Sequence, residues 1–455
     1  MPNTSVSLSV TSADNSPKEK KITRSLRSKK SPTRVEDPLP PASVPAERVK
    51  FATGTIPRFK DTCRLTNDPY SKECYMFSAD DSEAPEAHFY RCDTTNMRWT
   101  NLTHRLTYRI PHAPFSEEEL EPKTRQLPRI SHAGICFLHF RDTSFIVIFG
   151  GYDHHTASPS SDMIVINLKN LGWWIVRLED DDGKKEEVIP RISPEIVAID
   201  KTIYIFGGYR QFGDNPRPCT SFSVAKYAED EGRWKWTAKD KPYPAPVPSG
   251  KIFGSVCSAY NGKKILLGPG RLTDNNPINI AKDDLFFFDT TQHKFQPAIV
   301  NLKGSLPQDI AWYFLLEPHI WTPRTSANQA QPSSTVSSPE PPPIFMCASI
   351  PVANTEDSAP EIWQLSFSKK RIDCLHVSRM TWDIDTELEE CLFIASPGPR
   401  IRFIGTKEPP AAGKKRRRTR VIDSDDDETS SVDSEPNDAC NNATWNAYFD
   451  IPLFV

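Results

Sequence analysis

A sequence pattern that recurs along the middle of the chain constrains the fold more than any other feature. The pattern starts with a Pro-Arg dipeptide and an apolar residue, and it occurs at Pro57, Pro128 and Pro190. A short β-rich run follows, and then an apolar run that is closed by two glycines, Gly150-Gly151 in one unit and Gly207-Gly208 in the next. Self-similarity of this kind indicates one supersecondary unit that is stacked several times.

Each unit continues with a third apolar run and, six or seven residues after that run, a large aromatic side chain. These pairs are Asn167 with Trp173, Tyr227 with Trp234 and Asp289 with Phe295; an earlier unit ends on Trp99, and the glycines of the fourth unit are Gly268 and Gly270. A later unit holds apolar runs at residues 344–348 and 362–367, with a last strand at residues 372–374. The sequence therefore predicts five units of four short strands each.

A unit of this size requires neighbours. A four-stranded meander is too small to be stable alone, so each unit buries its faces against the next. Glycine at the end of the second strand allows a positive φ and a close backbone approach, and the aromatic residue supplies a large apolar area between units. Residues 391–395 and 401–404 are interpreted as strands of a weak sixth unit, whose outer strand is expected from residues 49–56.

The order of Pro-Arg, strand, double glycine, third strand and spaced aromatic resembles the kelch repeat. The close matches are Gly150-Gly151 with Trp173 and Gly207-Gly208 with Trp234, whereas Ser78-Ala79 replaces the glycines in the first unit. The resemblance implies an all-β fold, a kelch-type β-propeller of five or six four-stranded blades in the galactose-oxidase-like superfamily, without a BTB-like domain. It also implies an interaction module, a scaffold or adaptor whose propeller loops bind a protein partner.

Composition divides the chain into a folded middle and two charged ends. Residues 1–42 are expected to form a disordered basic arm, and residues 406–455 a disordered tail. Neither segment holds enough apolar surface to offset its chain entropy on folding. The propeller is assigned to residues 43–405, with a Ser/Pro-rich loop inserted at residues 323–343.

The C-terminal tail carries a dense basic run followed by an acidic block. The run consists of Lys414, Lys415, Arg416, Arg417, Arg418 and Arg420. Such a run is typical of a nuclear import signal, and it predicts an import receptor as partner and a nuclear or nucleocytoplasmic location. Nonspecific contact with nucleic acid is an alternative, although the run lacks aromatic residues for base stacking, and a solubilising tail is another. Ser424 and Ser430 precede acidic residues and resemble sites of acidophilic kinases.

Candidate residues for catalysis and metal binding are few. The sequence holds no G-x-S-x-G, H-E-x-x-H or P-loop motif. Asp153, His154 and His155, with His132 nearby in the repeat, are metal-ligand types, but adjacent histidines on a turn point in different directions. We interpret them as a polar loop and expect a binding module with no metal and no cofactor. The alternative is a metal-dependent enzyme that uses the central channel of the propeller.

Cysteines and apolar runs bear on location. The ten cysteines contain no C-x-x-C pair, so we expect them to be small buried hydrophobes in a reducing compartment. No run of 18 apolar residues is present and residues 1–10 are polar. The sequence therefore predicts neither a membrane-spanning helix nor a signal peptide.

Overall fold

The computed structural model describes the chain in segments, and every structural statement below refers to them. They are residues 42–43, 47–48, 53–55, 57, 64–68, 70–79, 86–109, 126–140, 143–176, 188–211, 217–228, 233–247, 253–259, 263–270, 278–299, 302, 305–310, 312–316, 344–351, 358–367, 374–381, 390–396, 400–407 and 445–452. The predicted loop at residues 323–343 lies outside these segments.

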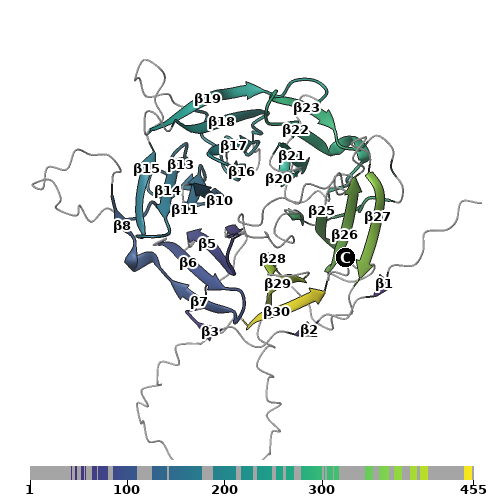
Figure 1. Ribbon diagram of the computed structural model, residues 1–455, viewed down its shortest axis with the longest axis horizontal. Helices are drawn as coiled ribbons and strands as arrows, with labels where there is room; N and C mark the ends of the chain where they lie inside the picture. The colour runs from purple at the N-terminus through teal and green to yellow at the C-terminus, as the bar shows by residue number, and fades with distance from the viewer. Residues whose placement is uncertain are drawn as a thin grey trace, which may run out of the picture. The chain divides into compact units, whose positions relative to one another are not determined.

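The fold is all-β, as predicted, and consists of antiparallel sheets that follow one another along the chain (Figure 1). No α-helix occurs in the described segments; two short 3-10 turns, η1 (Thr103–Arg105) and η3 (Lys282–Asp284), are the helical elements there. Nothing in this part of the chain is a helix long and apolar enough to cross a membrane.

Six successive sheets carry the repeat, and we number them from the N-terminus. Sheet 1 contains β4 (Arg64–Asn67), β5 (Glu73–Ala79), β6 (Ala87–Asp93) and β7 (Arg98–Asn101). Sheet 2 contains β10 (Gly134–Phe140), β11 (Thr143–Phe149), β14 (Met163–Asn167) and β15 (Gly172–Val176). Sheet 3 contains β16 (Glu195–Ile199), β17 (Thr202–Phe206), β18 (Ser221–Ala228) and β19 (Arg233–Pro242).

Sheets 4 and 5 follow the same strand order, and sheet 6 differs in its outermost strand. Sheet 4 contains β20 (Phe253–Ala259), β21 (Lys264–Pro269), β22 (Phe286–Asp289) and β23 (Lys294–Pro297). Sheet 5 contains β24 (Trp312–Leu316), β25 (Ile344–Pro351), β26 (Ser358–Phe367) and β27 (Cys374–Thr381). Sheet 6 contains β28 (Glu390–Ser396), β29 (Arg400–Lys407), β30 (Trp445–Pro452) and β2 (Glu47–Arg48).

Central strands are buried on both faces. In β11, Ile146, Val147, Ile148 and Phe149 are all fully buried, and the strand pairs with β10 on one side and β14 on the other. Side chains of a strand point alternately to its two faces, so a sheet covered on both faces needs apolar residues at every position. This explains why the sequence shows continuous apolar runs here and no alternation.

Aromatic residues on the outer strands pack against the preceding sheet. Trp173 of sheet 2 is 1% exposed and belongs to a core cluster with Phe77 and Phe89 of sheet 1. Trp234 of sheet 3 lies in a cluster with side chains of sheet 2, and Phe295 of sheet 4 lies in one with side chains of sheet 3. Trp99 of sheet 1 is also buried. The spaced aromatic of the repeat is therefore an inter-sheet core residue.

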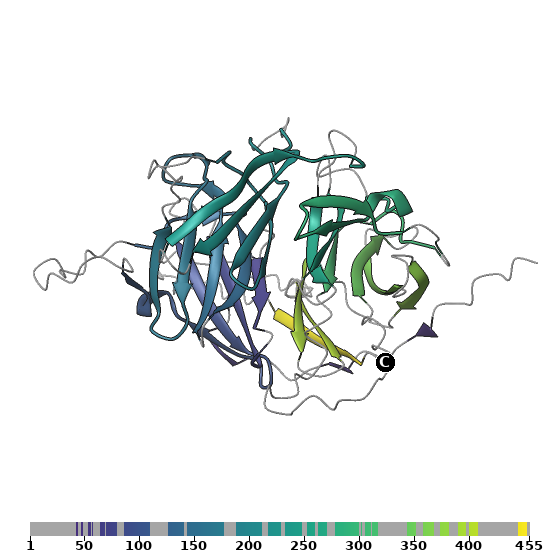
Figure 2. The same cartoon turned by 45° about the horizontal axis from the view of Figure 1, so that its top comes forward.

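The first strands of sheets 1 to 5 contact one another in chain order. β4 contacts β10, β10 contacts β16, β16 contacts β20 and β20 contacts β24. β28, the first strand of sheet 6, contacts β4 of sheet 1. Among these first strands, β10, β16, β20 and β28 are labelled in Figure 1, and Figure 2 shows the same sheets from a second direction.

The outer strand of sheet 6 does not come from residues 49–56, contrary to the prediction from the sequence. Its third strand, β30, comes from residues that the sequence places in a disordered tail, and β2 occupies the outer edge. Within residues 49–56, β3 (Thr53–Gly54) pairs with β7 of sheet 1 instead. The sequence Trp-Asn-Ala-Tyr-Phe-Asp-Ile alternates apolar and other residues as a strand does, but a long charged and polar segment precedes it, so the repeat pattern does not extend to it.

Sheet 5 also differs from the expected boundaries. Its first strand is β24, an aromatic-rich run that the repeat pattern did not assign. Its last strand is β27, which covers Cys374–Thr381 rather than the expected residues 372–374. The predicted loop at residues 323–343 falls between β24 and β25, the first two strands of this sheet. A short strand near the N-terminus, β1 (Ala42–Ser43), pairs parallel to β27 at the outer edge.

The double glycines occupy positions that other residues tolerate poorly. Gly151 has a φ of 98° and Gly208 a φ of 82°, both in the left-handed region. A Cβ on Gly151 would lie 2.5 Å from the Ser131 carbonyl oxygen. In the fourth unit the reason is space: a Cβ on Gly268 would collide with the Tyr313 hydroxyl, and one on Gly254 with the backbone of Gly270.

Candidate functional site: a loop face fastened by a buried arginine

The loops of sheet 2 that carry the repeat motifs form a small additional sheet. β9 (Ile130–Ser131) pairs with β12 (Tyr152–Asp153), which pairs with β13 (Ser158–Pro159). β9 begins with Ile130, the last residue of the Pro-Arg-Ile motif, and β12 directly follows the double glycine. The sequence pattern thus extends beyond the four core strands into the loops.

The same arrangement recurs above sheet 3. Tyr209, which follows Gly207-Gly208, forms antiparallel bridges with Ile192 and with Pro218. Tyr209 corresponds to Tyr152, because each tyrosine directly follows a double glycine. We name residues 126–133, 150–162, 188–194, 207–211 and 217–220 the loop face. The tyrosine after each double glycine is a sequence signal that the repeat analysis did not use.

Backbone hydrogen bonds join the two halves of the loop face. The Gly151 amide donates to the Arg191 carbonyl at 2.7 Å, and the Arg191 amide donates to the Ser160 carbonyl at 3.0 Å. The Ser193 amide donates to the His132 carbonyl at 2.7 Å. Because these bonds run between sheets 2 and 3, the loops of the two sheets form one hydrogen-bonded surface.

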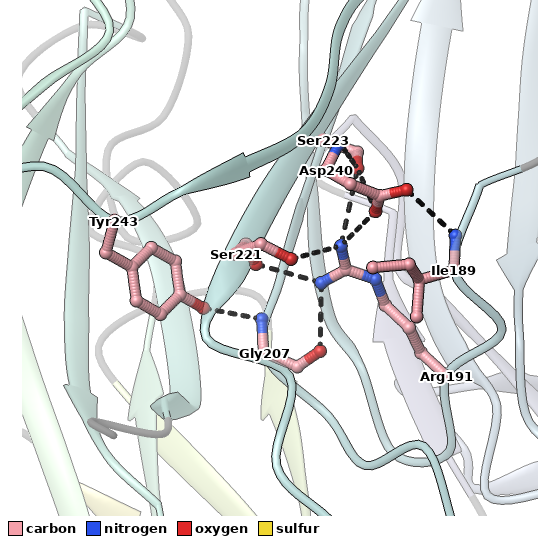
Figure 3. Close-up of polar contacts among 7 residues, drawn as sticks. All are labelled: Ile189, Arg191, Gly207, Ser221, Ser223, Asp240 and Tyr243. Atoms are coloured by element: carbon pink, nitrogen blue, oxygen red, sulfur yellow. Dashed lines mark hydrogen bonds and ion pairs between the residues drawn. The ribbon is translucent and has the colours of Figure 1, made fainter. Parts of the chain in front are cut away.

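Arg191 lies fully buried beneath this surface and binds three elements of sheet 3 (Figure 3). Its Nη1 donates to the carbonyl oxygens of Gly207 and Ser221, at 3.0 and 2.9 Å. Its Nη2 donates to Ser221 Oγ at 3.0 Å and forms an ion pair with Asp240 Oδ1 at 2.7 Å. A buried guanidinium is tolerated when it is paired and hydrogen-bonded in this way.

Asp240 connects the arginine to the chain that enters sheet 3 (Figure 3). Its Oδ2 accepts a hydrogen bond from the Ile189 amide at 2.9 Å, and its own amide donates to Ser223 Oγ at 3.0 Å. Asp240 has a φ of 43°, a left-handed conformation that is uncommon for residues with a side chain. The ion pair therefore fixes β18, β19 and the loop face relative to one another.

Tyr243 holds the other side of the double glycine. The Gly207 amide donates to the Tyr243 hydroxyl at 2.7 Å (Figure 3). Burial raises the pKa of the Tyr243 hydroxyl far above its usual range, so the group stays neutral at physiological pH. Gly207 is thus anchored through both its amide and its carbonyl.

The preceding Pro-Arg motif has a different role, because Arg129 is exposed. The strand register places Phe222 opposite Phe206 in sheet 3, and it places Met163 opposite Phe149 in sheet 2. Phe222 and Met163 therefore occupy equivalent positions. Ile164 of sheet 2 then stands where sheet 3 has Ser223, so sheet 2 lacks that polar partner. The motif alone does not decide whether its arginine is a core residue or a surface residue.

The polar loop predicted from Asp153, His154 and His155 is found on the loop face. Asp153 Oδ1 accepts from the His155 amide at 2.8 Å, and His154 Nε2 is 2.9 Å from Ser131 Oγ. These bonds engage the Asp153 carboxylate within its own turn and the His154 ring with β9 of the small sheet. The described segments contain no group of three His, Cys, Asp or Glu residues placed to hold a metal ion.

Glu195 is a charged residue that the sequence analysis did not single out. It opens β16 directly after the loop face, is half-buried, and has protein around its carboxyl group. Burial raises the pKa of this carboxyl from 4.5 to about 7, and the Arg64 guanidinium opposes the rise. A titratable group perturbed in this way is a functional-site candidate.

The other predicted site residues do not join this site. The repeat residues Trp99, Trp173, Trp234, Gly268 and Gly270 lie within the sheets or at their strand ends. The basic run from Lys414 to Arg420, Ser424 and Ser430 lies outside the described segments. That stretch connects β29 to β30, whose end residues Lys407 and Trp445 are register partners.

Comparison with known proteins identifies no family. No protein-family model matches the chain, and no curated protein matches its sequence at a significant level.

Proposed function

We propose that the six sheets form a closed kelch-type β-propeller. The sequential contacts of the first strands of sheets 1 to 5, together with the contact between β28 and β4, support this arrangement. Inter-sheet clusters built around the spaced aromatic residues support it as well. Closure would remove long exposed sheet edges, the usual advantage of this architecture.

The proposed function is that of a protein-interaction scaffold which binds its partner on the loop face. One observation carries this proposal: the loops of sheets 2 and 3 are joined by backbone hydrogen bonds and fixed from below by Arg191. Binding residues work best when a rigid scaffold positions them. The surface presents His155, Arg210 and Arg217 as exposed side chains on this frame.

The test compares two surfaces of the same protein. A loop-face variant carries His155→Ala, Arg210→Ala and Arg217→Ala; a control variant carries Lys169→Ala and Lys226→Ala, which lie exposed away from the loop face. Affinity purification with quantitative mass spectrometry measures the proteins that each variant retains. Partners lost from the loop-face variant and kept by the control support the proposal, whereas equal recovery by both variants would refute it. Stoichiometric copper or iron in the purified protein would favour the metal-dependent enzyme instead.

The proposed location is nuclear, through recognition of the basic run by an import receptor. Because β29 and β30 pair with each other, this run belongs to a connection tethered at both ends rather than to a terminal tail. Replacement of Lys415, Arg416, Arg417 and Arg418 by Ala should leave a fluorescent fusion outside the nucleus. Unchanged nuclear fluorescence, with Lys29 and Lys30 also replaced, would contradict this proposal.

A further inference from the structure

The outermost strands of three sheets each pair with one additional short strand. β3 pairs with β7 of sheet 1, β8 (Thr107–Tyr108) with β15 of sheet 2, and β1 with β27 of sheet 5, all in parallel (Figure 1). Sheet 6 already ends on the short strand β2. Among the described strands, none pairs with the outer edge of β19 in sheet 3 or of β23 in sheet 4.

These two edges differ in length. β23 has four residues, whereas β19 has ten and is, with β26, one of the two longest described strands. A long edge strand presents a row of backbone donors and acceptors to other chains, and proteins usually keep such edges short or cover them. β19 is therefore the edge that offers a further strand the most room.

The added strands of sheets 1 and 2 bond to the carbonyl oxygen of the spaced aromatic residue. In sheet 1 the Thr55 amide donates to the Trp99 carbonyl at 3.1 Å. In sheet 2 the Arg109 amide donates to the Trp173 carbonyl at 2.9 Å. The aromatic residue of the repeat thus has a second role, because its backbone carbonyl accepts the strand that is added to the sheet.

Trp234 turns its backbone groups to the edge of β19 in the same way. The Tyr227 amide donates to the Lys201 carbonyl, which lies on the β17 side of its strand. In an antiparallel strand the N–H and C=O of one residue point to the same side, so Tyr227 does not bond to β19. Its register partner Trp234 therefore directs its N–H and C=O outward. The acceptor used in sheets 1 and 2 is present on β19.

The first half of β19 has an apolar face and a cationic face. Trp234 and Trp236 pack with side chains of sheet 2. Arg233 and Lys235 lie on the other face, because strand side chains alternate and the register with β18 is regular over these four residues. A strand that pairs here meets two indoles on one face and two positive charges on the other.

The added strand of sheet 2 shows how the apolar face is used. Tyr108 is the register partner of Trp173, and the two rings pack edge to face with their centroids 5.0 Å apart. On the cationic face, acidic residues of an added strand would form favourable cross-strand pairs, whereas a second copy of β19 would add like charges to the same edge. Charge therefore favours an acidic partner over a second copy of this chain.

We propose that residues 233–236 of β19 form a second docking edge, which pairs in parallel with an extended acidic segment of a partner protein. The segment alternates acidic and apolar residues. In β8 the residues on both sides of Tyr108 donate their amides to sheet 2, so on β19 the acidic residues that flank an apolar one donate, and the Trp234 carbonyl accepts. Residues 233–236 lie outside the loop face, and the docking edge is a surface additional to it.

The probe is a capped peptide of seven residues, in which four glutamates alternate with valine, tyrosine and valine. Fluorescence anisotropy measures its binding to the full chain. N-methylation of the two glutamates beside the tyrosine should weaken binding at least about tenfold, because two backbone donors to β19 are lost. The matched control carries N-methyl groups on the tyrosine and the following valine, whose amides face away from β19, and it should bind like the parent peptide.

Charge reversal on the protein tests the cationic face. Arg233→Glu with Lys235→Glu should weaken binding of the glutamate peptide at least about tenfold and strengthen binding of a peptide with lysine in place of glutamate. Lys72→Glu with Lys169→Glu, at exposed positions of sheets 1 and 2, changes the net charge equally and should leave both affinities unaltered. Thermal melting confirms that both double variants are folded.

Three results with the natural protein would overturn the proposal: no binding up to about 5 mM peptide, equal affinity of the two methylated peptides, or equal affinity of the glutamate and lysine peptides. Hydrogen exchange provides a further readout, since the bound peptide should slow exchange of the β19 amides. A dimer of the full chain that protects these amides without peptide would also overturn it, because a second copy would then occupy the edge.

Discussion

The Nη2 atom of Arg191 lies 2.7 Å from Oδ1 of Asp240, although 49 residues separate them in the chain. The guanidinium is fully buried, and it reaches Gly207 and Ser221 from the same position. This pair joins β19, the strand that contains the repeat aromatic Trp234, to the loop that precedes sheet 3. The loop face owes its fixed geometry to this contact.

Removal of the acidic partner should destabilise the protein strongly. Asp240→Ala leaves a buried guanidinium without its counter-charge, which typically costs about 3–5 kcal/mol. Urea unfolding measures the change. Arg129→Ala is the matched control, since that arginine comes from the same motif but is exposed, and it should change stability by less than about 0.5 kcal/mol. Equal effects of the two substitutions would contradict the structural role of Arg191.

The inter-sheet aromatic residues should be as costly to remove. Trp173→Ala and Trp234→Ala each delete a buried indole between two sheets, and such truncations cost about 3–5 kcal/mol. Lys169→Ala, on an exposed turn of sheet 2, serves as the control and should be nearly neutral. Differential scanning calorimetry compares the three variants, and unchanged melting in both tryptophan variants would exclude this packing.

Glu195 should give the protein a characteristic pH dependence. Its pKa is raised from 4.5 to about 7 on folding, so the folded state holds the proton more tightly than the unfolded state. The associated stability is fully present below about pH 4.5 and is lost as the pH rises to about 7. Because the residue is half-buried, the loss should amount to about 1–3 kcal/mol.

Two substitutions isolate this contribution. Glu195→Gln should remove this part of the pH dependence and exceed the natural protein in stability at about pH 8. Glu73→Gln, at a carboxylate that pairs with Arg91 at 3.5 Å on sheet 1, should leave it in place. Denaturant unfolding across the pH range provides the measurement. A Glu195→Gln profile parallel to that of the natural protein would show that this carboxyl titrates normally.

The sequence predicted the strands of sheets 2, 3 and 4 well, because their signals are local. Apolar runs, double glycines and a spaced aromatic such as Trp173 are each visible within one unit. β30 was missed because about forty charged and polar residues separate it from β29, the strand with which it pairs. β24 was missed because it follows no Pro-Arg motif.

The candidate site was predicted only in part, for a physical reason. The motif shows that Arg191 belongs to a repeat, but its burial depends on Asp240 and Ser221, which arrive from other strands. Arg129 carries the same local sequence and is exposed. Glu195 has no motif at all, and its raised pKa arises from the way protein surrounds the start of β16.

Truncation after Lys407 tests the central claim most directly, because the proposed closed scaffold requires β30 as the third strand of sheet 6. A control replaces residues 408–444 by a short Gly/Ser linker and keeps β30 joined to β29. The account predicts that truncation lowers the melting temperature and exposes the backbone amides of β28 and β29 to hydrogen exchange, while the linker variant retains both properties. A truncated chain with unchanged melting and unchanged exchange protection in β29 would contradict the account.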